Sequence, residues 1–241
     1  MGDLDVAIMT LQEEVEETPE GHPDRASMLT VLGEHFCDRY ERTGNLPDLE
    51  ASIIHLEASV EATPENDPDR AIRLNNLGIH LSNRYEQLGN LQDLEDAIAR
   101  LEGAAESIPE DHPGRASLFR NLGDCLSSRY EHTGDLPDLE AAIALSEAAV
   151  VVIPEDHPDQ ARMLDNLACY LGERYEHTGN LADLEAAISR SEAAVEATPE
   201  GHSGQPGQLI NLGLLLSHDM NDLEIYRTWM LPSRSQGQRW K

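Results

Sequence analysis

The sequence is poor in basic residues. It has 17 Lys and Arg residues against 46 Asp and Glu residues, which gives a formal net charge of −29 with histidine neutral. A protein that binds nucleic acid needs a basic surface to neutralise phosphates, and anionic membrane surfaces attract basic segments rather than acidic ones. The charge balance therefore excludes nucleic acid as a partner and disfavours a membrane surface.

Aromatic residues and long hydrophobic runs are also scarce. Aromatic side chains make up 4% of the chain, whereas apolar residues reach 39%, enough for an aliphatic, helical core. The longest apolar runs, such as residues 148–153, are much shorter than the roughly 20 residues that span a bilayer. The first ten residues, MGDLDVAIMT, lack the basic and hydrophobic blocks of a secretory signal. We therefore expect a soluble, cytoplasmic chain.

Cysteine is rare as well. The three residues Cys37, Cys125 and Cys169 are far apart and form neither a CxxC motif nor a Cys/His ligand spacing. This usage fits a reducing compartment, where cysteines behave as small buried helix residues. We expect no metal and no cofactor.

A period of 45 residues dominates the chain. Pro-Glu pairs recur at this spacing, beginning at Pro19, Pro64, Pro109, Pro154 and Pro199. A glycine follows the same period at Gly44, Gly89, Gly134 and Gly179, and so does an Arg-Tyr-Glu triplet that begins at Arg39, Arg84, Arg129 and Arg174. A period of this length indicates a stack of repeated units.

Each unit is predicted to contain two amphipathic helices, which we call helix A and helix B. Helix A starts after a Pro-Asp element such as Pro68-Asp69, carries leucines at three- and four-residue steps, and stops at a glycine such as Gly89. Helix B is expected to start at Asp93 as its cap and to end before Pro109. The small residues Gly78 in helix A and Ala97 in helix B would let the two helices approach closely.

Stacked pairs of this kind predict an all-α fold, an α-solenoid of antiparallel helix pairs with a 45-residue repeat. The predicted array covers residues 3–218: a helix B over 3–18, then A/B pairs from about 23, 68, 113 and 158, and a partial helix A over 206–218. Residues 219–241 are interpreted as a degenerate basic tail. They contain both tryptophans, Trp229 and Trp240, together with four basic residues, Arg227, Arg234, Arg239 and Lys241.

The units resemble the tetratricopeptide repeat. The resemblance lies in the Leu-Gly pair of helix A (Leu77-Gly78, Leu122-Gly123), the alanine of helix B (Ala97, Ala142, Ala187) and the proline after it. The longer unit and the string from Asp67-Pro68-Asp69 to Asn76-Leu77-Gly78 are closer to the kinesin-light-chain subtype. They also resemble arrays that precede CHAT or nucleotide-switch domains in fungal and bacterial proteins. The resemblance implies a right-handed superhelix whose A helices line a concave, peptide-binding groove.

An asparagine before the Leu-Gly pair often contacts the backbone of a bound peptide in this family. Carried over to this sequence, the resemblance implies the row Asn76, Asn121, Asn166 and Asn211. The chemistry agrees, because an amide donates and accepts hydrogen bonds and so suits an extended backbone of any sequence. The alternative is that these side chains bridge neighbouring A helices or cap backbone groups.

Variable positions on the same face would supply side-chain specificity. In the predicted groove these are Asn75, Arg120 and Asp165 before the asparagine, and Ile79, Asp124, Asn83, Glu86 and Glu131 after it. The set is net acidic, and we therefore expect a basic peptide or protein segment as the partner.

The other periodic residues are interpreted structurally. The arginines are expected to pair with nearby carboxylates, in exposed pairs that contribute little. The tyrosines of the Arg-Tyr-Glu triplets are assigned to the core, and the histidines of the turns to capping or to solvent. The sequence contains none of the motifs HExxH, GxxxxGK[ST] and GxSxG, and we predict that the chain is not an enzyme.

Binding of a linear peptide in the groove is thus the leading functional hypothesis, and two alternatives remain. The chain could be a self-associating or spacer segment of a larger regulatory protein whose effector domain is absent here, forming a homodimer through uncapped array ends. It could also be an array autoinhibited by its own basic tail lying in the acidic groove.

Overall fold

The computed structural model describes the backbone of residues 2–154, 156–199 and 201–230, and the side chains in that part up to His218. The helices there are α1 (Asp3–Glu17), α2 (Arg25–Thr43), α3 (Leu46–Glu61), α4 (Arg70–Leu88), α5 (Leu91–Ser107), α6 (Arg115–Thr133), α7 (Leu136–Val152), α8 (Gln160–Thr178), α9 (Leu181–Ala197) and α10 (Gln205–Met230). No strand occurs among these residues. The predicted all-α class is confirmed.

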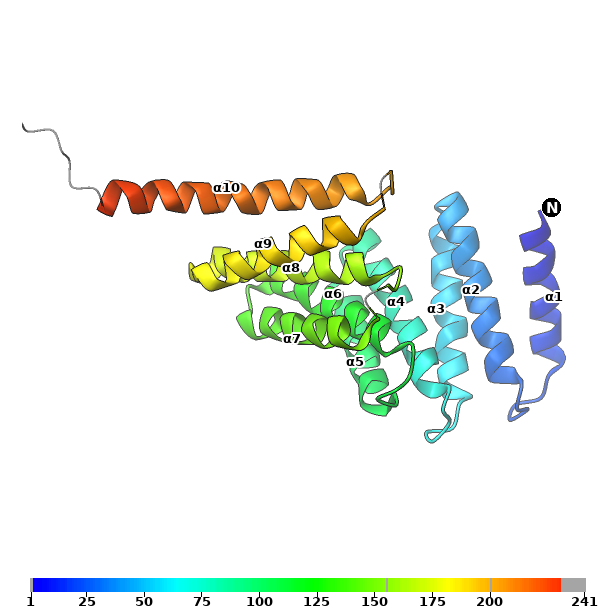
Figure 1. The fold of residues 1–241 in the computed structure, drawn as a ribbon. Coiled ribbons are helices and arrows are strands. Elements are labelled where there is room, and N and C mark those ends of the chain that lie inside the picture. The colour runs from blue at the N-terminus through cyan, green and yellow to red at the C-terminus, as the bar shows by residue number, and fades with distance from the viewer. Residues whose placement is uncertain (1, 155, 200, 231–241) are drawn as a thin grey trace, which may run out of the picture. The chain divides into compact units, whose positions relative to one another are not determined.

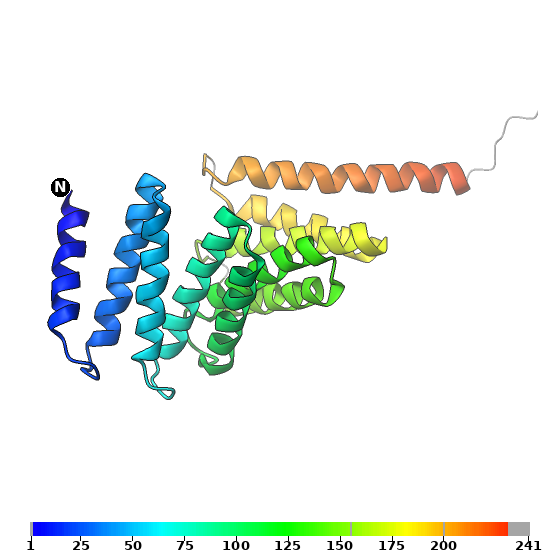
Figure 2. The ribbon, with the colours of Figure 1, turned by 180° about the vertical axis from the view of Figure 1, so that it is seen from behind.

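Even-numbered helices are of type A and odd-numbered ones of type B. Each complete pair packs together, as α2 with α3, α4 with α5, and α8 with α9, and a helix B also packs on the next helix A. Figures 1 and 2 show α2 and α3 side by side. The chain forms two compact units, Met1–Leu145 and Ser146–Lys241, with the boundary inside α7.

Glycine ends the A helices as predicted. Gly44, Gly89, Gly134 and Gly179 have φ between 67° and 72°, the left-handed conformation that favours glycine, and each backbone N–H bonds to the carbonyl of the tyrosine four residues earlier. Glu224 stands at the next position of this period, and α10 continues past it to Met230. The helix therefore extends into the segment interpreted as a tail from residue 219, of which residues 231–241 lie outside the described part of the chain.

The start of helix B differs from the prediction. The B helix α5 begins at Leu91, and Asn90 rather than Asp93 caps it, with the side chain of Asn90 accepting a hydrogen bond from the backbone N–H of Gln92. Asp93 lies in the first turn and is buried, where it pairs with Arg84 of the preceding helix. Because the carboxylate of Asp93 pairs with an arginine nine residues earlier in the chain, it does not cap the helix.

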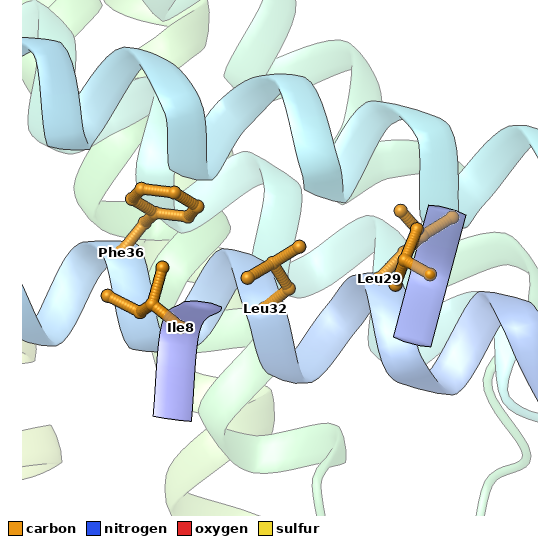
Figure 3. Packing of buried hydrophobic residues seen from close by; sticks show 5 residues of the cluster. Ile8, Leu29, Leu32 and Phe36 are labelled. Atoms are coloured by element: carbon orange, nitrogen blue, oxygen red, sulfur yellow. The ribbon is translucent and has the colours of Figure 1, made fainter. Parts of the chain in front are cut away.

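The core lies along the seam within each pair and between successive pairs. Ile8 of α1 packs against Leu32 and Phe36 of α2 in the first of these contacts (Figure 3). Within the pair α4–α5, a Cβ atom added at Gly78 would lie 2.6 Å from Cγ of Leu101 and 3.3 Å from the carbonyl oxygen of Ala97. The close approach predicted from Gly78 and Ala97 is therefore confirmed.

Candidate functional site

The side of the A helices that faces away from their own B helices holds the predicted site residues. On α4 these are Asn75, Asn76, Ile79, Asn83 and Glu86, and on α6 they are Arg120, Asn121, Asp124 and Glu131. The remaining three belong to the second unit, with Asp165 and Asn166 on α8 and Asn211 on α10. The 3.6-residue period of the helix places these positions on one face.

A cavity of about 200 Å³ brings six of these residues together in the first unit. It lies between α4 and α6, and its lining consists of Ile79, Ser82, Asn83, Glu86, Leu101, Arg120, Asn121, Asp124 and Cys125. Leu101 comes from the B helix α5, and its side chain is fully buried. The cavity thus combines apolar atoms with amides and charged groups, the mixture expected of a binding pocket.

Arg120, which lines this cavity, has an unsatisfied donor. Its guanidinium NH1 donates to Oδ2 of Asp124 at 3.1 Å, whereas its buried Nε has no hydrogen-bond partner in the part of the chain that the structure describes. An unbonded N–H shielded from water costs free energy, and an acceptor supplied by a ligand would remove that cost.

Three amides of the asparagine row bridge neighbouring A helices. Nδ2 of Asn76 donates to Oε1 of Glu34 on α2 at 3.0 Å, and Nδ2 of Asn121 donates to Oδ1 of Asn75 on α4 at 2.9 Å. In the second unit, Nδ2 of Asn211 lies 3.3 Å from Oδ2 of Asp165. The bridging interpretation is confirmed for these donors, and contact with a peptide backbone stays a prediction.

Not every predicted residue joins the cavity. Asn76 is half-buried and its amide donates toward α2, away from α6, while Glu131 is exposed near the end of α6. Asn166 is half-buried on α8 and has an interaction of its own. Sequence reasoning missed the cavity residues Ser82, Leu101 and Cys125. Ser82 lies one turn after Ile79, Cys125 lies one turn after Asn121, and Leu101 is on the facing helix B. These positions are the only signal that could have indicated them.

Burial shapes the acid–base behaviour of this face. Burial, together with the negative charges of Asp124 and Glu86, raises the pKa of the Cys125 thiol to about 11, although a hydrogen bond with Ser82 lowers it in part. Burial also raises the pKa of Glu34 and, in the second unit, that of Asp165. These shifts mean that the face disfavours additional negative charge, and a cation nearby would relieve them.

The arginine ladder is structural, as predicted, although its pairs are not exposed. In each repeat the guanidinium makes two hydrogen bonds to one aspartate of its own helix B, in the pairs Arg39–Asp48, Arg84–Asp93, Arg129–Asp138 and Arg174–Asp183. All four aspartates are buried. The bidentate geometry makes these pairs stronger than the exposed pairs that the sequence suggested.

The histidines of the turns cap backbone groups, as expected. Nδ1 of His22, His112, His157 and His202 accepts a hydrogen bond from the backbone N–H two residues later. Cys37 and Cys125 are buried and Cys169 is half-buried, all as free thiols. Among the described residues, no group of three or more His, Cys, Asp or Glu side chains could hold a metal ion. No described helix is long and apolar enough to cross a membrane.

A second cavity, of about 390 Å³, lies in the second unit between the turns that precede α8 and α10. Gln208 lines it and accepts a hydrogen bond from Oγ1 of Thr198 at 2.7 Å. Arg73 stands at the equivalent position of α4, where it is buried and donates to Oγ1 of Thr63. Asp165 is the one predicted site residue in the lining of this cavity.

The fold and these faces define an all-α helical-repeat protein. Residues 115–159 and 160–202 match the model of the tetratricopeptide repeat family. The resemblance to this repeat and to its kinesin-light-chain subtype is thus confirmed. No curated protein matches the chain.

Solved structures of the same fold are similar at low sequence identity. BtubC (BKLC) from P. vanneervenii has a TM-score of 0.64 at 18% identity, covering 100% of this chain and 99% of its own. MamA has a TM-score of 0.56 at 19% identity, covering 81% and 89% respectively. YrrB, described as a TPR protein with an unusual peptide-binding site, has a TM-score of 0.55 at 16% identity, covering 83% and 80%. These likenesses support a helical-repeat solenoid of helix pairs.

Proposed function

We propose that the chain is a protein-interaction scaffold that binds a linear peptide segment against its A helices. The repeat fold supports the scaffold role in general. The observation that carries the finer proposal is the cavity between α4 and α6, which is lined by Arg120, a residue whose Nε is unbonded among the described residues. This cavity would be the anchoring subsite.

The cavity suits an aliphatic side chain with a basic neighbour. Its volume of about 200 Å³ and its apolar atoms from Ile79 and Leu101 match a branched aliphatic group. Glu86 and Asp124 line the same cavity and would attract a Lys or Arg next in the peptide. A backbone carbonyl of the peptide would accept from Nε of Arg120. We therefore propose a basic peptide with an aliphatic anchor as the ligand.

Burial of the thiols supports a binding role rather than a catalytic one. The pKa of Cys37 and that of Cys125 rise to about 11, and that of Cys169 rises to about 12, with burial as the first cause in each case. Thiols with such pKa values stay protonated at neutral pH and are poor nucleophiles. Three free cysteines also suit the reducing cytoplasm, which we propose as the location.

A selection from a proteome-derived peptide library tests this function on the full chain. The test variant is Ile79→Glu, which places a charge in the cavity, and the matched control is Ile72→Glu, at an exposed isoleucine of the same helix outside the cavity. We expect the library to yield peptides that bind the wild type and the control equally well. Their affinity for Ile79→Glu should be at least about tenfold lower, which corresponds to a loss of about 1.4 kcal/mol in binding free energy. We also expect binding to weaken with salt.

Two results would contradict the proposal. Equal binding to Ile79→Glu and Ile72→Glu would place the ligand elsewhere on the chain. Enrichment of no peptide by the wild type would favour the spacer alternative. Autoinhibition by the basic tail concerns residues 231–241, outside the described part, together with the side chains of the last turns of α10. We make no proposal from it.

A further inference from the structure

Within residues 146–230, the A helix α10 is packed on one side only. Figures 1 and 2 show α9 against α10 and no other helix of residues 146–230 on the opposite side. Leu209 and Leu216 of α10 are 51% and 40% exposed. The leucines at the same repeat positions of α4, Leu74 and Leu81, are 8% and 2% exposed because α5 covers them. The open side of α10 is thus the side that receives a helix B.

Glycine geometry supports this assignment. A Cβ atom at Gly78 of α4 would collide with Leu101 of α5, whereas a Cβ atom at the equivalent Gly213 of α10 would meet no described atom within 4 Å. The described residues up to Met230 do not form a helix B after it, since α10 continues past the position at which earlier A helices stop. The site for a leucine from a helix B is therefore present in α10, and no described residue fills it.

The helix α1 presents the complementary surface. Its Ile8 and Val15 are buried against α2, but Leu4, Ala7 and Leu11 are only half-buried. These three occupy the positions of Leu94, Ala97 and Leu101 in α5, all of which are fully buried because they face their own helix A. The side of α1 that would contact its own helix A is therefore partly open.

The two open surfaces repeat the residues of a complete pair. The A helix α10 carries Leu209, Leu212, Gly213 and Leu216 where α4 carries Leu74, Leu77, Gly78 and Leu81. The B helix α1 carries Leu4, Ala7 and Leu11 where α5 carries Leu94, Ala97 and Leu101. Every residue type is the same. We propose that α10 of one copy receives α1 of a second copy of this chain and that the contact reproduces the α4–α5 pair.

Charge opposes the contact and sets its conditions. The ladder pair Arg84–Asp93 has no counterpart, because Asp219 takes the position of the arginine and Asp3 that of the aspartate. Each copy also carries a net charge of −29. Association should therefore be weak at low ionic strength and stronger in salt, which screens the repulsion. This contact is heterologous, so it leaves one α1 and one α10 surface free in a dimer and permits larger assemblies.

Sedimentation velocity on the full chain, over a range of concentrations and salt, tests the proposal. The blocking variant is Gly213→Leu. A single chain has space for this leucine, but in the assembly the leucine would occupy the site of Leu11 from the second copy. The control is Leu214→Glu, on another face of α10 and also well exposed. The strengthening variant is Asp219→Arg, which would restore a ladder pair with Asp3 of the second copy.

We expect the mass of the wild type to rise with concentration, and to rise further in salt. Gly213→Leu should weaken association roughly 30-fold or more, as for the loss of a central contact, while Leu214→Glu stays within about threefold of the wild type. Asp219→Arg should tighten association. A wild type and an Asp219→Arg variant that both stay monomeric throughout would overturn the proposal. So would a Gly213→Leu chain that keeps its helicity and associates like the wild type.

Discussion

The two sides of α4 differ in how they change from repeat to repeat. On the seam side, which faces α5, Gly78 has the equivalents Gly33, Gly123, Ala168 and Gly213, all small. On the groove side, which faces the neighbouring A helices, Ile79 has the equivalents Glu34, Asp124, Cys169 and Leu214. The seam repeats because each pair must pack in the same way. The groove is free to vary, and under the proposed function this variation would give each position its own binding chemistry.

The largest expected effect comes from breaking the seam ladder. In Arg84→Met the buried carboxylate of Asp93 would lose both of its hydrogen bonds from the guanidinium. We expect a loss of about 3 kcal/mol in the free energy of unfolding, since an unpaired buried charge is strongly destabilising. Urea denaturation followed by circular dichroism would measure it.

Arg100→Met on α5 is the control, because Arg100 is exposed and outside the ladder. It should change stability by less than about 0.5 kcal/mol. If Arg84→Met unfolded at the same urea concentration as Arg100→Met, the ladder would have no structural role.

Alanine at two glycines should give effects of opposite sign. Gly78→Ala forces a Cβ atom to within 2.6 Å of Leu101, and overpacking of this kind costs about 1–3 kcal/mol. Gly213→Ala meets no described neighbour and should stabilise α10 by about 0.5–1 kcal/mol, because glycine is a poor helix former. Thermal unfolding of both variants measures the difference. Destabilisation of both to the same extent would show that the side of α10 at Gly213 is covered in solution.

A buried histidine should make the first unit sensitive to acid. Burial lowers the pKa of His80 from 6.5 to about 4, and its Nδ1 lies 2.6 Å from Oγ of Ser52 on α3. The folded state therefore favours the neutral ring. The contribution of His80 to stability is complete above about pH 6.5 and is lost as the pH falls from there toward 4. By pH 5 the loss in the free energy of unfolding should reach roughly 1–2 kcal/mol. The negative charge of Asp38 nearby opposes this shift in part.

His80→Tyr tests the pH effect, because Tyr170 occupies the equivalent position of α8 and is buried there. The variant should lose less stability than the wild type when urea unfolding is repeated at pH 7 and pH 5. Identical losses in the two proteins would assign the acid sensitivity to other groups.

The seam could be predicted almost completely from the sequence, and the groove only in part. Leucine spacing, the stop at Gly89 and the small residues Gly78 and Ala97 are local signals, so they indicate where helix A ends and where the two helices touch. The pairing of Asp93 with Arg84 could not be read from the sequence, because a carboxylate in a first turn also suits a cap. Which role prevails depends on the position of the preceding helix.

The groove depends on contacts between repeats. Asn121 donates to Asn75, one repeat and one residue earlier, so that the row of asparagines links neighbouring A helices. The cavity also depends on the direction that Arg120 takes toward Asp124, which leaves its Nε unbonded. Side-chain directions of this kind follow from packing across repeats, and a 45-residue period alone does not specify them.

The smallest expected effect on stability lies on the groove side. In Asn76→Ala the exposed hydrogen bond to Glu34 is lost, and the free energy of unfolding should change by less than about 0.5 kcal/mol because water replaces the bond. The same urea measurement that finds about 3 kcal/mol for Arg84→Met would check it. A loss above about 1 kcal/mol for Asn76→Ala would mean that the groove side of α4 is as structural as the seam side. A near-zero value would leave Asn76 free to vary for binding, because its substitution would not destabilise the fold.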